Sequence, residues 1–248
     1  MGWVGLKQFD NSIIRDKEKD RMIKNIIFDF GGVLLDLRPD RCIAEFKKLG
    51  IPEIDQMLSL AHQQGVLGDM ERGMFTIDAF CDAMRAAHTG AFERTGKFRS
   101  LMPFIKDGYP IPAPTNRQIA LAFSSMCDGI PAYRLDFINQ LKKEGFHVSA
   151  LSNTNTIHWD YCLRYFIEAG YDPRELFENT WLSYEMHLVK PDPAIFKAIL
   201  EESGYVPEET LFVDDNQHNC DVAASFGIHT FCPPIRRDWT IQIRQHLH

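Results

Sequence analysis

The feature that most constrains the fold is a regular alternation of short apolar segments with helical segments between residues 133 and 231. Glycine stands just past each helical segment, as expected for a left-handed helix end. Short apolar strands alternating with helices predict an α/β fold with a parallel sheet covered on both faces. The predicted helices span 133–143, 158–169, 193–202 and 218–226, and the predicted strands 146–151, 180–182, 210–213 and 228–231.

Polar residues follow three of the predicted strands at the point where each strand ends. The first strand, in the stretch IIFDFGGVLLD, ends at Asp29; a later strand ends at Ser152-Asn153, and another at Asp214-Asp215. Ligands of an open parallel sheet bind at the carboxyl ends of its strands. We therefore expect these groups to converge on one crevice.

Residues 37–125 interrupt the alternation and are expected to be mostly helical, with helices over 41–49, 54–64, 76–87 and 115–127. We interpret this insertion as a helical cap domain over the crevice. The predicted organisation is an extension at 1–21, an α/β core formed by 22–36 and 126–248, and the cap at 37–125.

Composition excludes several classes of function. The net charge is −7 and no dense basic run occurs, so nucleic acid is not an expected partner. No apolar run approaches the ~20 residues of a membrane span. Six cysteines are scattered without a Cys-x-x-Cys pair, which favours reduced thiols in a cytoplasmic protein.

Four elements occur in the order Asp29, Ser152, Lys190 and Asp214-Asp215, within FDFGGVLLD, LSNTN, VKPDP and FVDDNQHNCDVAASFG. In this order they resemble the four motifs of the haloacid dehalogenase (HAD) superfamily, in the branch with a helical C1-type cap. The resemblance covers residues 22 to about 232 and implies a Rossmann-like core. The combination of Asp-x-Gly-x-Val with LSNTN looks most like the glucose-1-phosphatase type of sugar-phosphate phosphatase.

The resemblance implies a Mg²⁺-dependent phosphatase acting on a small phosphorylated metabolite. Three crowded carboxylates call for a hard divalent cation, and Mg²⁺ suits oxygen ligands. The nucleophile would be Asp29, forming an aspartyl-phosphate. By resemblance, the metal ligands would be Asp29, the Gly31 carbonyl and Asp215, with Asp214 behind them, and the phosphate would be held by Phe30, Gly31, Ser152, Asn153 and Lys190.

One position departs from the family pattern. Superfamily phosphatases usually carry a second aspartate, the general acid–base, where this chain has Gly31. Three explanations stay open: Asp36 replaces the acid, the leaving group departs readily as from an anomeric sugar phosphate, or the protein binds phosphometabolites without fast turnover. A haloacid dehalogenase is a weaker alternative, because its motif typically has Tyr where Gly31 stands.

The cap offers three polar candidates for substrate contact. They are Gln63, Glu71 and Arg72, and a solvated helix or turn residue is the favoured interpretation of each. His158 is expected on a helix surface, and Asn219 is expected to bond the loop of the fourth motif. The sequence leaves the substrate and the oligomeric state open.

Overall fold

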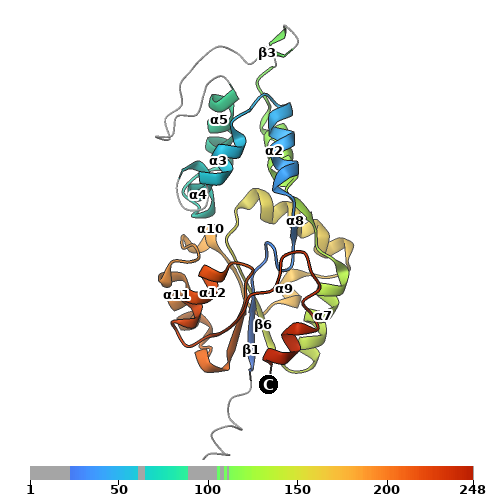
Figure 1. Ribbon diagram of the computed structural model, residues 1–248, viewed down its shortest axis with the longest axis vertical. Helices are drawn as coiled ribbons and strands as arrows, with labels where there is room; N and C mark the ends of the chain where they lie inside the picture. The colour runs from blue at the N-terminus through green and yellow to red at the C-terminus, as the bar shows by residue number, and fades with distance from the viewer. Residues whose placement is uncertain (1–22, 61–64, 89–104, 107–108, 111, 248) are drawn as a thin grey trace, which may run out of the picture.

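The computed structural model describes residues 23–60, 65–88, 105–106, 109–110 and 112–247. Figure 1 shows a sheet with helices on both sides and a separate group of helices above the carboxyl ends of its strands. The α/β architecture predicted from the alternation of strands and helices is confirmed. Among the described residues, none of the helices combines the length and the apolar character that crossing a membrane requires.

The main sheet has five strands in the order β7-β6-β1-β8-β9, and all neighbouring pairs are parallel. The central strand β1 pairs through Phe28 with Ala150 on one side and with Val213 on the other. The strands that end at Asp29 and Asp214 are therefore direct neighbours. The bounds are β1 Asn25–Phe28, β6 His147–Ser152, β7 Thr180–Leu182, β8 Thr210–Val213 and β9 His229–Phe231.

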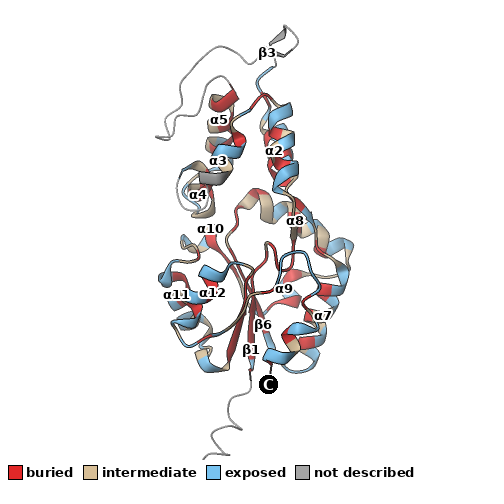
Figure 2. Cartoon of the chain, in the orientation of Figure 1, coloured by how far each residue is buried: buried red, intermediate tan, exposed pale blue. Residues whose placement is uncertain are grey.

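Alternate residues of β1 serve the two faces of the sheet. Ile26 and Phe28 belong to the hydrophobic cluster that includes α7 (Ala132–Lys143) and α8 (Thr156–Glu168), whereas Ile27 packs with α11 (Pro193–Ser203) and α12 (Gln217–Ala224). All three side chains are fully buried, as the red strands of Figure 2 show. A strand buried on both faces needs a continuous apolar run, and IIF supplies it.

The helices of the core begin and end close to the predicted residues. Asn155 and Asn216 cap α8 and α12 by accepting hydrogen bonds from the backbone N–H groups of His158 and His218. The glycines expected after the helices, including Gly145 and Gly204, have positive φ. The helices are α7 Ala132–Lys143, α8 Thr156–Glu168, α9 Pro173–Leu176, α10 Ser183–Met186, α11 Pro193–Ser203 and α12 Gln217–Ala224, with 3-10 turns at Pro207–Glu209 and Gln242–His246.

A second hydrophobic cluster holds the inserted helices together, around Phe46, Phe80, Met84 and Phe123. The inserted elements are α2 Pro39–Lys48, α3 Ile54–Leu60, α4 Val66–Glu71, α5 Ile77–His88, β3 Ile105–Lys106, β4 Tyr109–Pro110 and α6 Asn116–Ser124. The short helix α4 was not predicted, because its six residues are too few for a periodic pattern.

The predicted helix over 115–127 is wrong at its end. The helix stops at Ser124, and Cys127 instead begins strand β5 (Cys127–Gly129), which pairs antiparallel with β2 (Asp36–Leu37). Pairing with a segment ninety residues earlier overrides the local helical preference. This strand pair joins the core to the inserted helices. The domain boundaries predicted from the sequence, with the core ending at residue 36 and resuming at residue 126, stay a proposal.

Candidate active site

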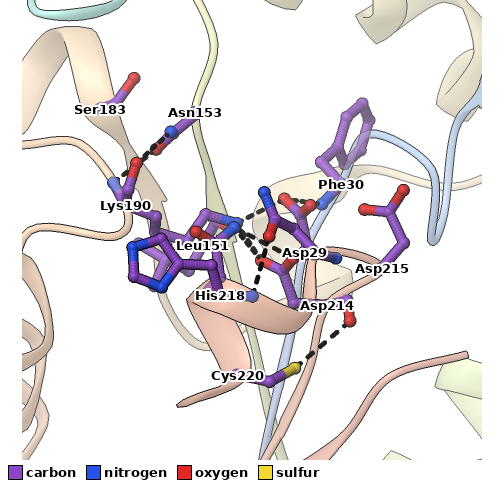
Figure 3. A network of polar contacts seen from close by, with 12 residues as sticks. Asp29, Phe30, Leu151, Asn153, Ser183, Lys190, Asp214, Asp215, His218 and Cys220 are labelled. Atoms are coloured by element: carbon purple, nitrogen blue, oxygen red, sulfur yellow. Dashed lines mark hydrogen bonds and ion pairs between the residues drawn. The ribbon is translucent and has the colours of Figure 1, made fainter. Parts of the chain in front are cut away.

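Two neighbouring strands deliver three carboxylates to one point. Asp29 follows β1, and Asp214 and Asp215 follow β8; one oxygen from each lies within 4.8 Å of the others. Asp29 and Asp214 are buried, and Asp215 is partly exposed. Figure 3 shows the three side chains together at the sheet edge.

A single buried lysine faces this cluster. Lys190, in the loop between α10 and α11, places Nζ 2.7 Å from Asp29 Oδ1 and 2.7 Å from Asp214 Oδ2. Nζ also donates to the Leu151 carbonyl oxygen at 3.0 Å. Burial alone lowers the pKa of Lys190, but the two carboxylates outweigh it and raise this pKa above its usual value, so the amine stays charged.

One lysine does not neutralise three carboxylates. Burial raises the pKa of Asp29 to about 7, against the opposing effect of Lys190, and the charge of Asp214 adds to the rise. Burial and Asp214 also raise the pKa of Asp215. Three carboxylates facing one lysine leave the cluster with excess negative charge, which a hard divalent cation with oxygen ligands would offset. The donor set fits Mg²⁺.

The paired aspartates differ in how they are held. Asp214 accepts hydrogen bonds from Asn219 Nδ2 at 3.0 Å and from the Asn216 backbone N–H at 2.8 Å, in addition to the Lys190 contact. No other residue in the described part of the chain makes a hydrogen bond or ion pair with the Asp215 carboxylate. Asp215 is therefore the more available metal ligand of the two. The hydrogen bond from Asn219 to Asp214 also confirms the prediction that Asn219 bonds the loop of the fourth motif.

A glycine makes room for Asp215. Gly32 has φ +80, and a Cβ on it would collide with the Asp215 carboxylate. Glycine is therefore required here both for the left-handed backbone and for the close approach of the acid.

The end of β6 meets the lysine loop through an amide pair. Asn153 Nδ2 donates to the Lys190 carbonyl oxygen, and the Lys190 backbone N–H donates back to Asn153 Oδ1, both at 2.8 Å. Ser152 is buried beside them. The structure thus brings Asp29, Asp214, Asp215 and Lys190 together, with Ser152 and Asn153 alongside.

A cavity of about 260 Å³ opens next to these residues, between core and inserted helices. Its core wall includes Phe30, Gly31, Ser152 and Asn153, and its opposite wall is formed by Leu58, Leu67, Glu71 and Phe123. Burial raises the pKa of Glu71 to about 7, against the weaker effects of Arg72 and Lys190. A small organic group fits this space.

Of the remaining candidates, Asp36 and the Arg72 side chain do not line the cavity, whereas the Phe30 backbone contacts Asp29. Asp36 does not line the cavity; its Oδ1 accepts from Arg134 Nη1 at 2.8 Å. The Arg72 carbonyl oxygen accepts from His187 Nδ1 at 2.8 Å, and its side chain does not line the cavity. Gln63 lies outside the described residues. The Phe30 ring packs on Trp159 and Phe166, while its N–H donates to Asp29 Oδ1 at 2.6 Å.

The prediction of a surface His158 is wrong. His158 lines the cavity, its Nε2 donates to the Phe123 carbonyl oxygen at 3.1 Å, and burial lowers its pKa to about 4. Thr154 and Asn155 also line this wall and were not predicted as site residues. Their position directly after Ser152-Asn153, at a strand end, was the available signal.

The chain resembles known proteins over most of its length. A family model described as haloacid dehalogenase-like hydrolase matches residues 23–227. D-ribitol-5-phosphate phosphatase of Bacteroides thetaiotaomicron is 32% identical over 219 residues, which cover 88% of this chain and 95% of that protein.

Solved structures agree with this result. A HAD family enzyme from Bacteroides thetaiotaomicron, in complex with magnesium and inorganic phosphate, is 37% identical, with 90% of this chain and 100% of that chain covered and a TM-score of 0.74. A predicted HAD-like family hydrolase from Porphyromonas gingivalis is 30% identical, with 92% and 98% covered and a TM-score of 0.75. A dehalogenase at 17% identity, with a TM-score of 0.53, shows the shared fold alone.

Proposed function

This chain belongs to the haloacid dehalogenase-like hydrolases, and we propose that it is a Mg²⁺-dependent phosphatase that hydrolyses a small phosphomonoester through an aspartyl-phosphate. The observation that carries the proposal is the buried Lys190 amine, 2.7 Å from both Asp29 and Asp214, beside a further carboxylate that needs a cation.

The proposed roles follow from position. Asp29 attacks phosphorus, because it ends a rigid strand and its carboxylate lies beside the cavity wall formed by Phe30 and Gly31. Lys190 holds Asp29 in place and offsets the repulsion between this carboxylate and the anionic phosphoryl group. Ser152, the Asn153 amide and the backbone of Phe30 and Gly31 bind the phosphoryl oxygens that do not react.

The residues proposed to hold the metal are Asp29, Asp215 and the Gly31 carbonyl, with Asp214 orienting Lys190 and the loop. When bound, Mg²⁺ neutralises the carboxylates and stabilises charge on the phosphoryl oxygens. Support comes from the acidic cluster and from the relative's structure, which contains magnesium and inorganic phosphate.

The proposed substrate is a phosphorylated sugar or sugar alcohol. A cavity of about 260 Å³, closed on one side by α3, α4 and α6, suits a metabolite and is too small for a macromolecule. The relative named D-ribitol-5-phosphate phosphatase supports this class. The sequence also resembles glucose-1-phosphatases, and on that basis we propose an anomeric sugar phosphate as one candidate substrate. Six unpaired cysteines suit a reducing compartment, and we propose a cytoplasmic setting.

The alternative is a protein that binds phosphometabolites with little turnover, favoured only by glycine at position 31. Phosphate release from glucose-1-phosphate, glucose-6-phosphate, ribitol-5-phosphate and p-nitrophenyl phosphate, with Mg²⁺ or EDTA, separates the two. We expect release with Mg²⁺ and none with EDTA. If the protein binds phosphate but releases none from any of the four compounds, the result would support the phosphometabolite-binding protein instead.

A further inference from the structure

The position of the usual general acid is filled in this protein. A Cβ on Gly31 would meet Leu37 Cδ1 at 3.2 Å, tighter than ordinary van der Waals contact. Leu37 belongs to β2, which is fixed by pairing with β5. The Leu37 side chain thus lies against position 31, which itself carries no proton donor, so a donor for the leaving group has to come from another residue.

Two nearby titratable groups are already engaged. Asp36 is in an ion pair with Arg134, whose Nη1 also donates to the Leu34 carbonyl oxygen. His158 lines the cavity, but its Nε2–H donates to Phe123 and its Nδ1 lies 3.2 Å from Asn155 Nδ2. With its pKa lowered to about 4 by burial, His158 stays neutral and fixed. The ion pair holds Asp36, and both ring nitrogens of His158 are engaged, so neither side chain is free to reach the leaving group.

Glu71 is the acidic residue in the wall of this cavity, among the described residues. It is the last residue of α4, on the side opposite Ser152 and Asn153. Within the part of the chain that the structure describes, its carboxyl group has no hydrogen bond or ion pair. Burial raises its pKa to about 7, so both the protonated and the ionised form are accessible near neutral pH.

The turn that follows Glu71 is anchored to the core. The Arg72 carbonyl oxygen accepts a hydrogen bond from His187, and Gly73, at φ +66, lies directly against the Tyr184 carbonyl oxygen. These contacts fix the end of α4 to the segment around α10. The backbone that carries Glu71 is therefore held against the core, although its helix belongs to the inserted region.

We infer that Glu71 is the general acid–base of the reaction and acts from the inserted helices in place of the carboxylate absent at position 31. This inference rests on the proposed phosphatase function. As Asp29 bonds to phosphorus and the bond from phosphorus to the leaving oxygen breaks, Glu71 gives its proton to that oxygen and releases the alcohol. The Glu71 carboxylate then takes a proton from water as the water oxygen attacks phosphorus. Phosphate leaves, and Asp29 and protonated Glu71 are restored.

The test compares leaving groups that need a proton with one that does not. Glu71→Gln keeps the shape of the side chain but holds no transferable proton. With a primary alkyl phosphate such as ribitol-5-phosphate, we expect kcat to fall about 10²–10⁴-fold. With p-nitrophenyl phosphate, rapid mixing should show a first burst of p-nitrophenolate at the wild-type rate, followed by slow steady turnover, because the hydrolytic step has lost its base.

Controls separate this inference from the function on which it rests. Asp69→Asn removes a carboxylate from the same helix outside the cavity lining and should leave both rates unchanged. Glu71→Ala should regain activity with added formate. Three results for Glu71→Gln would overturn the role of Glu71. They are an equal loss of the p-nitrophenolate burst rate and of kcat with ribitol-5-phosphate, a change in KM alone, and no loss of either rate. A wild-type protein without metal-dependent turnover would instead refute the proposed phosphatase, and the inference with it.

Discussion

The two sides of the cavity are built in different ways. On the core side, Lys190 and Asp214 are each tied to several partners, including the Leu151 carbonyl, Asn219 and the Asn216 backbone. On the opposite side, the wall includes Leu58, Leu67 and Phe123, and Glu71 is its one acidic residue within the part of the chain that the structure describes. The acidic cluster is thus fixed by a network of polar contacts, whereas the wall formed by the inserted helices is mostly apolar.

The difference has a physical reason. Residues on strands are held more precisely than residues on loops, and reacting groups must be held within about 0.5 Å of their productive geometry. The inserted helices have their own hydrophobic cluster and are joined to the core by the β2–β5 pair. Their residues can change without disturbing the acidic cluster, so this side is the place where substrate preference can vary.

The largest effect is expected from breaking the core network at its centre. Lys190→Met leaves Asp29 and Asp214 buried without their cation, because the replacement keeps the volume but not the charge. We expect the free energy of unfolding to fall by about 3–5 kcal/mol and turnover to be lost. Denaturant unfolding and phosphate release measure the two losses.

An exposed lysine provides the control. Lys197→Met removes the partner of Glu201 on the surface of α11, where an ion pair contributes little. A stability loss for Lys190→Met no larger than that for Lys197→Met would contradict the buried network.

A smaller effect is expected where the inserted helices meet the core. Gly73→Ala places a methyl group against the Tyr184 carbonyl oxygen at a left-handed backbone position. The turn after α4 must shift, and a displacement of about 1 Å at Glu71 should lower turnover about 10–100-fold. Steady-state kinetics with ribitol-5-phosphate is the measurement.

Gly65→Ala is the matched control for this change. Gly65 also has positive φ, at +90, but a Cβ there has nothing within 4 Å. Both variants carry backbone strain, and only Gly73→Ala disturbs the contact with the core. Equal kinetics for the two would show that this contact does not position the cavity wall.

The smallest effect on turnover is expected at Asp36. Asp36→Asn leaves the buried Arg134 guanidinium without its charged partner, so the free energy of unfolding should fall by about 1.5–3 kcal/mol. Turnover should change less than about twofold, since Asp36 does not line the cavity. A fall in kcat of tenfold or more, with an alkyl phosphate but not with p-nitrophenyl phosphate, would restore Asp36 as the substitute acid.

The sequence predicted the core well because its signals are local. Apolar runs and glycines predicted the strands of the main sheet and the longer helices α7, α8, α11 and α12, and the carboxyl-edge rule brought Asp29 next to Asp214. The inserted region was harder. The end of α6 was set by pairing between Cys127 and Leu37, and the place of His158 was set by its bond to Phe123. Such long-range contacts leave no pattern in a single sequence.

The most direct test of the account is to trap the reaction after its first step. Wild-type protein and Asp29→Asn would be mixed with substrate and Mg²⁺, quenched in acid, and analysed by peptide mass spectrometry. The account predicts one phosphoryl group on the wild-type peptide that contains Asp29, with no adduct and no phosphate release for the variant. Undiminished phosphate release by Asp29→Asn would contradict it.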